Sequence, residues 1–174
     1  MGLDEIDPFT VFRTEYAQFF TVMEDLLGNR TILKVNNNLG YIAGDAPTYE
    51  RFYLGGRSFR GFDFRTISPK SAAAIDPAQP APNDPIGGNW LFFFGAQVEQ
   101  PFVKDAMSGV LFVDSGTVTQ DVGFDQYRVS VGLGIRLYIP QFGPAPLAFD
   151  FAVPVMKEDT DETQVFSFSA EIPF

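Results

Sequence analysis

The sequence predicts an all-β fold, an antiparallel up-and-down β-barrel whose strands cross a membrane. Seven segments alternate apolar and polar residues, the last segment ends on Phe174, and long and short connections fall at opposite ends of the strands. Successive side chains of a strand point to opposite faces, so each segment has one apolar and one polar face. In a membrane barrel the apolar face meets lipid and the polar face lines the lumen.

Residues 12–22 and 31–41 form the first two alternating segments. In the first, Phe12, Tyr16 and Phe20 share one face, and charged or small residues occupy the other. In the second, leucine, valine and tyrosine alternate with lysine, asparagine and glycine. Both patterns have the period of two that predicts a half-buried strand.

Residues 90–100 and 109–118 form the next two segments. Alternation places Glu99 on the less apolar face of the first segment, and it places Asp114 on the face opposite Leu111 in the second. Both acidic residues are therefore expected to point into the lumen.

Residues 127–139 show the most regular alternation, with valine, leucine and isoleucine opposite serine, glycine and arginine. Residues 147–155 set leucine, phenylalanine and valine against alanine, aspartate and proline. In residues 165–174, Phe166 and Phe168 lie on the apolar face and serines lie on the other. These three segments complete the seven strands.

A soluble β-sandwich and a lipocalin-like barrel would also produce alternation. The polar faces favour the membrane barrel, because they carry arginine, lysine, glutamate, aspartate and asparagine among small glycines and serines. Such a face is typical of a wet lumen.

The connections divide into two sets if Phe174 lies at the periplasmic end. Outer-membrane barrels have short periplasmic turns and longer extracellular loops. The extracellular set would be residues 55–88, 119–126 and 157–163, and the periplasmic set would be residues 25–30, 101–107 and 141–146. Residues 1–174 are thus expected to form one barrel segment with a long extracellular loop at about 55–88.

Composition excludes several functions. The net charge of −10 argues against nucleic-acid binding, which needs clustered lysine and arginine. The chain has no cysteine and no histidine, and no nucleophile–base pattern is visible, so we expect no enzyme, cofactor or metal site.

No apolar run approaches the ~20 residues of a membrane helix. The acidic start is no secretory signal, which an outer-membrane protein needs. The chain is therefore expected to be a mature sequence or a fragment with an added start, or else it is not an outer-membrane protein.

The long connection has two parts of different composition. Residues 68–82 are crowded with proline and alanine, which predicts an extended tract. Residues 52–62 pack aromatic rings, glycines and two arginines into a short space. Rings favour burial and glycines permit tight turns, so this part is expected to fold back against the barrel.

An ordered set of motifs resembles the BamA-type outer-membrane assembly factors, the bacterial surface antigen family. Their sixth extracellular loop carries an Arg-Gly-Phe/Tyr motif after an aromatic–Gly-Gly stretch and tucks into the barrel. The matching residues are Phe52–Gly56 with Arg60, Gly61 and Phe62, then Glu99 before Pro101, Phe112-Val113-Asp114-Ser115-Gly116, Gly143-Pro144 and the aromatic-ending last strand. The resemblance covers essentially residues 9–174.

The resemblance implies a structural role for the loop arginine. By analogy with the family, Arg60 should pair with Asp114 and with Glu99 inside the lumen. Family members have sixteen strands and periplasmic POTRA domains, so the chain resembles the C-terminal part of a longer protein. Residues 49–54 are a candidate for an eighth strand.

The terminal strand is the expected site of barrel closure. Family members close through a weak seam at this strand, whose apolar face comprises Phe166, Phe168, Ile172 and Phe174. Pro173 lacks a backbone N–H and is expected to weaken the seam further.

The function implied by the resemblance is insertion of unfolded outer-membrane proteins into outer-membrane lipid. A two-partner-secretion translocase and a passive structural barrel are the alternatives. Seven strands leave two exposed edges, so we expect closure with an eighth strand, pairing with a second copy, or completion by an N-terminal half of the barrel. The acidic stretch at residues 157–162 lacks the spacing of a calcium loop and is expected to be solvated.

Overall fold

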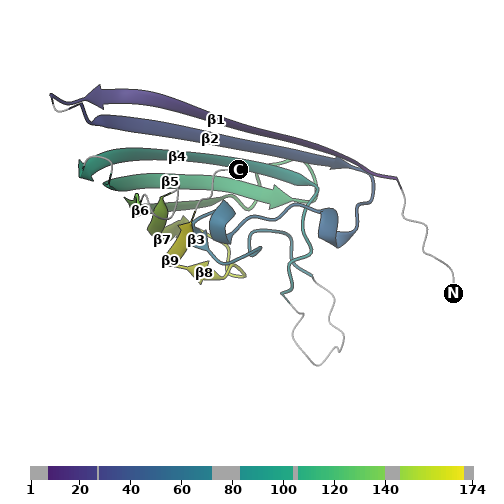
Figure 1. The fold of residues 1–174 in the computed structure, drawn as a ribbon. Coiled ribbons are helices and arrows are strands. Elements are labelled where there is room, and N and C mark those ends of the chain that lie inside the picture. Colours follow the sequence, from purple (N-terminus) through teal and green to yellow (C-terminus); the bar gives the residue numbers. More distant parts are fainter. Residues whose placement is uncertain (1–7, 27, 72–82, 104–105, 140–145, 171–174) are drawn as a thin grey trace.

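Seven strands form one antiparallel sheet in the computed structural model, which describes residues 8–26, 28–71, 83–103, 106–139 and 146–170. Each strand pairs with the next in the chain, so the sheet is a meander that curves around the long connection (Figure 1). The strands are β1 (Thr10–Glu24), β2 (Arg30–Ala43), β4 (Trp90–Val103), β5 (Met107–Thr119), β6 (Arg128–Leu137), β7 (Leu147–Met156) and β9 (Phe166–Ala170). The prediction of an all-β antiparallel meander is confirmed.

The remaining elements are short. Two 3₁₀ turns, η1 (Thr48–Glu50) and η2 (Gly56–Ser58), lie in the connection between β2 and β4. A second sheet of two strands joins β3 (Gly61–Phe62) to β8 (Thr163–Gln164). In the described part of the chain, no helix is both long enough and apolar enough to cross a membrane.

The strand register confirms the predicted alternation of faces. Leu111, Leu133 and Phe151 lie side by side across β5, β6 and β7, and their side chains are exposed. Phe112 and Ala152, each one residue away from these, are buried on the opposite face. We call the face covered by residues 44–71 and 83–89 the inner face and the opposite one the outer face.

The sheet is open among the described residues. β1 pairs with β2 alone, and β9 pairs with β7 alone. The two edge strands, β1 and β9, therefore each have one side whose backbone N–H and C=O groups pair with no other strand among the described residues. Such an edge can act as a template for a further strand.

The main apolar core lies between the long connection and the inner face. Phe59, Phe62 and Ile67 are each 0 % exposed. They pack with residues of β2, β4 and β5, and the whole cluster comprises Ile42, Ala46, Phe52, Leu54, Phe59, Phe62, Ile67, Leu91 and Val118. Burial of these rings ties the connection to the sheet, as the composition of residues 52–62 predicts.

The proposal that residues 49–54 supply an eighth barrel strand is wrong. Residues 48–50 form η1, and Phe52 and Leu54 make isolated bridges to Gly88 and Ile67, within the connection itself. Both side chains are buried in the core cluster. This segment therefore packs against the inner face of the sheet and is not one of its strands.

Candidate functional site

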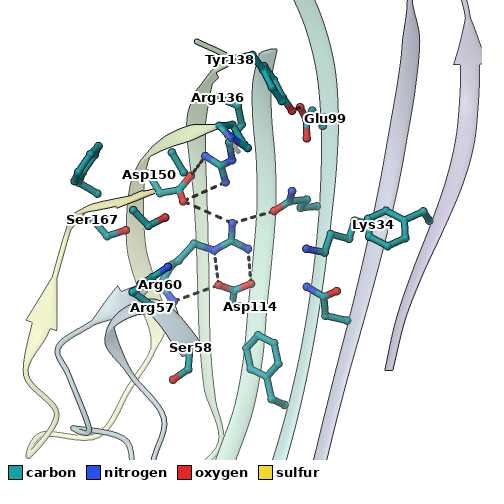
Figure 2. A pocket seen from close by; sticks show the side chains of 18 residues that line it. Lys34, Arg57, Ser58, Arg60, Glu99, Asp114, Arg136, Tyr138, Asp150 and Ser167 are labelled. Atoms are coloured by element: carbon teal, nitrogen blue, oxygen red, sulfur yellow. Dashed lines mark hydrogen bonds and ion pairs between the residues drawn. The ribbon is translucent and has the colours of Figure 1, made fainter. Parts of the chain in front are cut away.

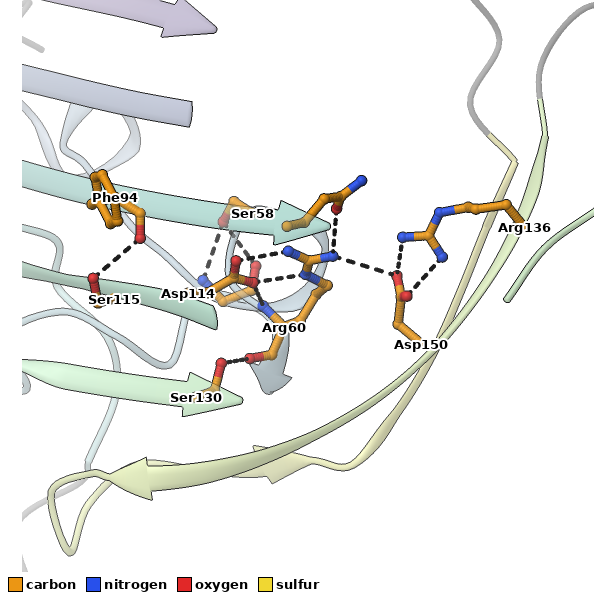
Figure 3. A network of polar contacts seen from close by, with 10 residues as sticks. Ser58, Arg60, Phe94, Asp114, Ser115, Ser130, Arg136 and Asp150 are labelled. Carbon is orange, nitrogen blue, oxygen red and sulfur yellow. Dashed lines mark hydrogen bonds and ion pairs between the residues drawn. The ribbon is translucent and has the colours of Figure 1, made fainter. Parts of the chain in front are cut away.

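Arg60 reaches from the long connection to Asp114 on the inner face of β5 (Figure 3). Its Nε donates to Oδ2 of Asp114 at 2.7 Å, and its Nη2 donates to Oδ1 at 2.7 Å. The backbone N–H of Arg60 also donates to Oδ2, at 3.2 Å. The side chains are 15 % and 2 % exposed, so this planar two-bond pair is largely shielded from water.

Further contacts hold the arginine on its other sides. Its Cζ atom lies 3.5 Å from the centroid of the Phe112 ring, a cation–π contact. Nη1 donates to Oε1 of Gln97 at 3.1 Å, and Ser130 Oγ donates to the carbonyl oxygen of Arg60 at 2.6 Å. The guanidinium therefore has polar or aromatic partners from both β4 and β5.

Glu99 does not join this pair. Within the described residues no ion pair links it to Arg60; its Oε1 accepts a hydrogen bond from the hydroxyl of Tyr138 at 2.8 Å. The prediction that Glu99 is a second partner of Arg60 is therefore wrong, and the strand register explains why. Asp114 lies opposite Gly95, and Glu99 is four residues further along β4, roughly 13 Å away. Gln97 is nearer, and its Oε1 accepts the hydrogen bond from Nη1 of Arg60.

Gly61 lets the chain pass close to the inner face. Its φ of 92° lies in the region that favours glycine. A Cβ atom at this position would lie 3.2 Å from the Cβ atoms of Ala152 and Ser130. Phe62, the next residue, is 0 % exposed and packs edge to face against Phe59 at 5.1 Å between ring centroids. The glycine thus brings the motif backbone onto β6 and β7 while the phenylalanine fills the core.

Gly116 of the strand motif also permits close packing. A Cβ atom there would meet the carbonyl oxygen of Phe92 at 2.4 Å. Gly132 has the same character, since its Cβ would lie 2.4 Å from the ring of Phe112. Gly116 therefore lets β5 lie close to the backbone of β4, and Gly132 leaves space for the Phe112 ring, against which the guanidinium of Arg60 packs.

A second buried ion pair stands beside the first. Arg136 Nη1 donates to Oδ1 of Asp150 at 2.7 Å, and the side chains are 9 % and 8 % exposed. Oδ2 of Asp150 also lies 4.0 Å from Nη1 of Arg60. The two pairs therefore form one charge network that joins the loop motif to β5, β6 and β7 (Figure 3).

Asp161 makes a third pair that the sequence analysis missed. Its carboxylate accepts hydrogen bonds from Nε and Nη2 of Arg128 at 2.9 and 3.0 Å, and it also accepts one from the backbone N–H of Glu158. The expectation that residues 157–162 are solvated is wrong at this position, because Asp161 folds back over β6. Alternation marks Arg128 as inner-facing, but no local pattern distinguishes Asp161 from its acidic neighbours.

The segment around Asp161 also pairs with the long connection through backbone hydrogen bonds. β3 pairs with β8, so that Gly61 lies opposite Gln164 and Phe62 opposite Thr163. The N–H of Asp63 donates to the carbonyl oxygen of Glu162 at 3.0 Å. We call residues 157–164 the clasp. The Arg-Gly-Phe motif is therefore held by β5 on one side and by the clasp on the other.

A cavity of about 670 Å³ lies beside the network (Figure 2). Most of the residues that line it are polar, and they come from both the strands and the long connection. The charged members are Lys34, Arg57, Arg60, Glu99, Asp114, Arg136 and Asp150. Ser167 and Ser169 of β9 also line it, so the terminal strand presents its polar face to the interior.

The terminal strand is described as far as Ala170. Phe166 and Phe168 are 45 % and 53 % exposed on the outer face. They stack beside Phe151 and Phe149 of β7, each with 5.1 Å between ring centroids. The predictions for Ile172, Pro173 and Phe174 lie outside the described residues.

Comparison with known proteins adds independent findings. A family model described as the Omp85 superfamily domain matches residues 2–174. The outer membrane protein assembly factor BamA of Nitratidesulfovibrio vulgaris is 32 % identical over 132 residues, 72 % of this chain and 16 % of that protein. BamA of Neorickettsia risticii is 26 % identical over 166 residues, 90 % of this chain and 21 % of that protein. The chain thus spans about a fifth of either relative.

A solved structure has the same fold. The crystal structure of BamA from Haemophilus ducreyi lacking POTRA domains 1–3 superposes with a TM-score of 0.76 and 22 % sequence identity. The match covers 92 % of this chain and 34 % of that one. At this identity the likeness establishes the arrangement of strands.

Proposed function

Because the chain belongs to the Omp85 superfamily, we propose that it forms the C-terminal part of an outer-membrane β-barrel that assembles other outer-membrane proteins. The curated relatives bear the name of outer membrane protein assembly factors. The substrates on this proposal are unfolded outer-membrane proteins, and the surrounding medium is outer-membrane lipid. The proposed mechanism uses strand pairing and involves no bond chemistry.

The outer face supports the membrane placement. Leu111, Leu133, Phe151 and Val153 are each about half exposed or more, and they form a continuous apolar surface across three strands. The opposite face holds buried arginines and aspartates. A water-soluble sheet would have the reverse arrangement, whereas lipid on the outside and a polar lumen inside account for both faces. The long connection would then lie on the extracellular side.

The docked arginine is the observation that carries the assembly proposal. A passive barrel needs no buried guanidinium from a long loop, because desolvation of the charge opposes folding. Here Arg60 and Asp114 are both largely buried, and they connect the loop to β5, the central strand of the sheet. Nη1 of Arg60 also lies 4.0 Å from Oδ2 of Asp150 on β7, the strand beside β9. We call the Arg60–Asp114 pair the loop lock. We propose that it preserves the arrangement of the C-terminal strands while the edge of β9 remains free to pair with a substrate strand.

The edge of β9 is where we propose that substrates are templated. An incoming strand adds to an exposed edge through backbone hydrogen bonds, which is β-augmentation. β9 presents alternate phenylalanines to the outside and serines to the cavity, so an added strand of the same alternation would match both environments. Weakening of this seam by Pro173 remains part of the proposal.

Strand direction bears on how the barrel closes. Neighbouring strands are antiparallel throughout, so the first and the seventh, β1 and β9, run the same way. Direct closure would create a parallel pair, and so would two copies inserted in the same orientation. Bacterial barrels of one chain have even strand numbers and antiparallel pairs. We therefore propose that an odd number of further strands, in an N-terminal half, completes the barrel, and we disfavour the homodimer.

A polypeptide translocase is the second function considered. Transport of a polypeptide through the lumen would require the long connection to move away from the inner face. This movement would break the Arg60–Asp114 pair and the core cluster around Phe59. Templating at the edge leaves both in place. The structure of the loop therefore favours assembly over translocation.

Reconstitution tests the proposal. The chain is inserted into lipid vesicles together with the N-terminal strands proposed to complete its barrel, and an unfolded outer-membrane protein is delivered by a periplasmic chaperone. The folded, heat-modifiable form of the substrate is then measured over time by gel migration. We expect faster folding than in empty vesicles, and a smaller acceleration with Arg60→Ala.

Each alternative predicts a different result. No acceleration by the completed barrel with an unmodified chain would contradict the assembly function. Acceleration that is unchanged in Arg60→Ala would contradict the role of the loop lock. Arg57→Ala is the matched control, because Arg57 lies on the same loop and its side chain is exposed.

A further inference from the structure

The connection between β5 and β6 folds onto the outer face of the sheet. Thr117 has the same strand parity as the exposed Leu111, yet it is 0 % exposed. Its hydroxyl donates to the carbonyl oxygen of Asp125 at 2.8 Å and lies 3.2 Å from that of Gln126. Gln126 has a φ of 54°, a left-handed conformation that reverses the chain. Residues 120–127 therefore cover the outer side of β5.

Aromatic rings fix this fold. Phe124 packs edge to face on Phe92 of β4, with 5.2 Å between ring centroids. Tyr127 lies 6.4 Å from Phe124 and donates its hydroxyl hydrogen bond to Ser115 Oγ at 3.1 Å. We call Phe92, Phe124 and Tyr127 the rim cluster.

The rim cluster leaves an apolar surface uncovered. Phe124 is 59 % exposed and Val122 is 64 % exposed, although Phe124 already contacts two rings. Both side chains belong to a loop that lies against the outer face, where the exposed side chains of β5, β6 and β7 form the proposed lipid surface. The exposed patch therefore continues that surface beyond the end of the strands.

Its level in the membrane follows from strand length. About 9–11 tilted residues of a β-strand cross the apolar layer. Thr117 is the eleventh residue of β5 counted from Met107, so the rim cluster lies at the boundary between hydrocarbon and water. Aromatic side chains concentrate at this boundary in membrane proteins. The exposed carboxylates of Asp121 and Asp125 keep the loop out of the hydrocarbon itself.

We propose that residues 120–127 are a membrane-interface anchor, with Phe124 and Val122 inserted among the lipid headgroups and upper acyl chains. The rim cluster holds the loop in the inserting conformation, and the partner is a lipid surface. This inference rests on the membrane placement proposed above. It adds a contact by which one connection, rather than the strands, fixes the depth of this edge of the sheet.

Tryptophan fluorescence in vesicles tests the anchor. The chain has one tryptophan, so Trp90→Phe provides a silent background. Phe124→Trp and Val122→Trp are probes of the loop, and Leu111→Trp probes the outer face of β5. Phe64→Trp is the control, an aromatic residue of the long connection that is 70 % exposed. The full chain is refolded into phosphatidylcholine vesicles whose acyl chains are brominated near the glycerol or near the terminal methyl.

We expect both loop probes to lose emission in lipid brominated near the glycerol, and Leu111→Trp to lose more in deeply brominated lipid. Phe64→Trp should keep its emission and be quenched by aqueous iodide. If Leu111→Trp is quenched by lipid but both loop probes respond to iodide alone, the anchor is overturned and the membrane barrel stands. Equal lipid quenching of Phe64→Trp would also overturn it. If Leu111→Trp is not quenched by lipid, the membrane placement fails and the anchor fails with it.

Discussion

The guanidinium of Arg128 holds the carboxylate of Asp161 through two hydrogen bonds of 2.9 and 3.0 Å, with side chains that are 2 % and 0 % exposed. This pair fixes the clasp, and the clasp pairs with the Arg-Gly-Phe motif through β3 and β8. The motif is therefore held at two places, by Asp114 on β5 and by the clasp, which leads into the terminal strand β9. We call the Arg60–Asp114 pair and the clasp the two fastenings of the motif.

Asp114→Asn should destabilise the folded chain by about 3–5 kcal/mol, because Arg60 would remain buried without its counter-charge. Arg60→Lys should recover part of the stability of Arg60→Ala, since an ammonium keeps the charge but lacks the planar fork. The free energy of unfolding by urea in lipid vesicles measures both. Arg57→Ala should change it by less than about 0.5 kcal/mol, as expected of an exposed side chain. A loss below about 1 kcal/mol for Asp114→Asn would mean that water reaches the pair.

Asp161→Asn should also cost about 3–5 kcal/mol, because it leaves Arg128 buried and uncompensated. Asp159→Asn is the matched control, an exposed carboxylate two residues away in the same clasp. The same urea titration measures the two variants. Equal effects of Asp161→Asn and Asp159→Asn would contradict the buried pair.

The two fastenings should be energetically coupled. Combining Arg60→Ala with Asp161→Asn should give a loss that differs from the sum of the single losses by about 0.5–3 kcal/mol, since both act on the same loop segment. A double-mutant cycle of unfolding free energies measures the difference. Arg60→Ala with Glu15→Gln on the exposed strand β1 should be additive. Additivity in both cycles would show that the clasp and Asp114 hold the loop independently.

Gly61→Ala should destabilise by about 1–3 kcal/mol, because a φ of 92° is strained for a residue with a Cβ atom. The new methyl group would also press against Ala152 and Ser130 at 3.2 Å. Gly123→Ala is the control, since its Cβ would meet a single atom, Oδ2 of Asp125, at 3.5 Å. Unfolding in urea compares the two, and a neutral Gly61→Ala would indicate that the motif is loosely held.

Lys70 should contribute to the pH dependence of stability. Burial lowers the pKa of Lys70, although the carboxylates of Asp161 and Glu162 oppose this shift. Since the unfolded chain then binds the proton more tightly, the free energy of unfolding should rise as pH rises from the lowered pKa towards 10.5. Lys70→Met should remove this part of the alkaline rise, and the exposed Lys157→Met should leave it. Urea midpoints between about pH 8 and about pH 10.5 measure the difference.

Motif order and strand alternation were sufficient to identify the family. The matched residues run from the loop motif at Arg60 to the strand motif at Phe112 and Gly116, and the family model covers residues 2–174. The alternation also placed Asp114 and Arg128 on the inner face. These features are readable because a strand repeats every two residues, so the face of each side chain follows from its neighbours.

The partners of the inner-face charges were not readable in the same way. Glu99 and Asp114 share a face, but the register between β4 and β5 decides that Arg60 meets Gln97 rather than Glu99. Asp161 is one of several carboxylates in an acidic connection, and its burial depends on the path of the clasp over β6.

The sequence by itself determined the strands, the face of each side chain and the family, because these depend on local alternation and on motifs in fixed order. Only the tertiary structure decided how residues 44–71 and 83–89 cover the inner face and which carboxylate each arginine holds. It also decided that residues 120–127 turn outward over Thr117. Such choices depend on contacts between residues far apart in the chain, where packing and hydrogen bonds compete and no local period records the outcome.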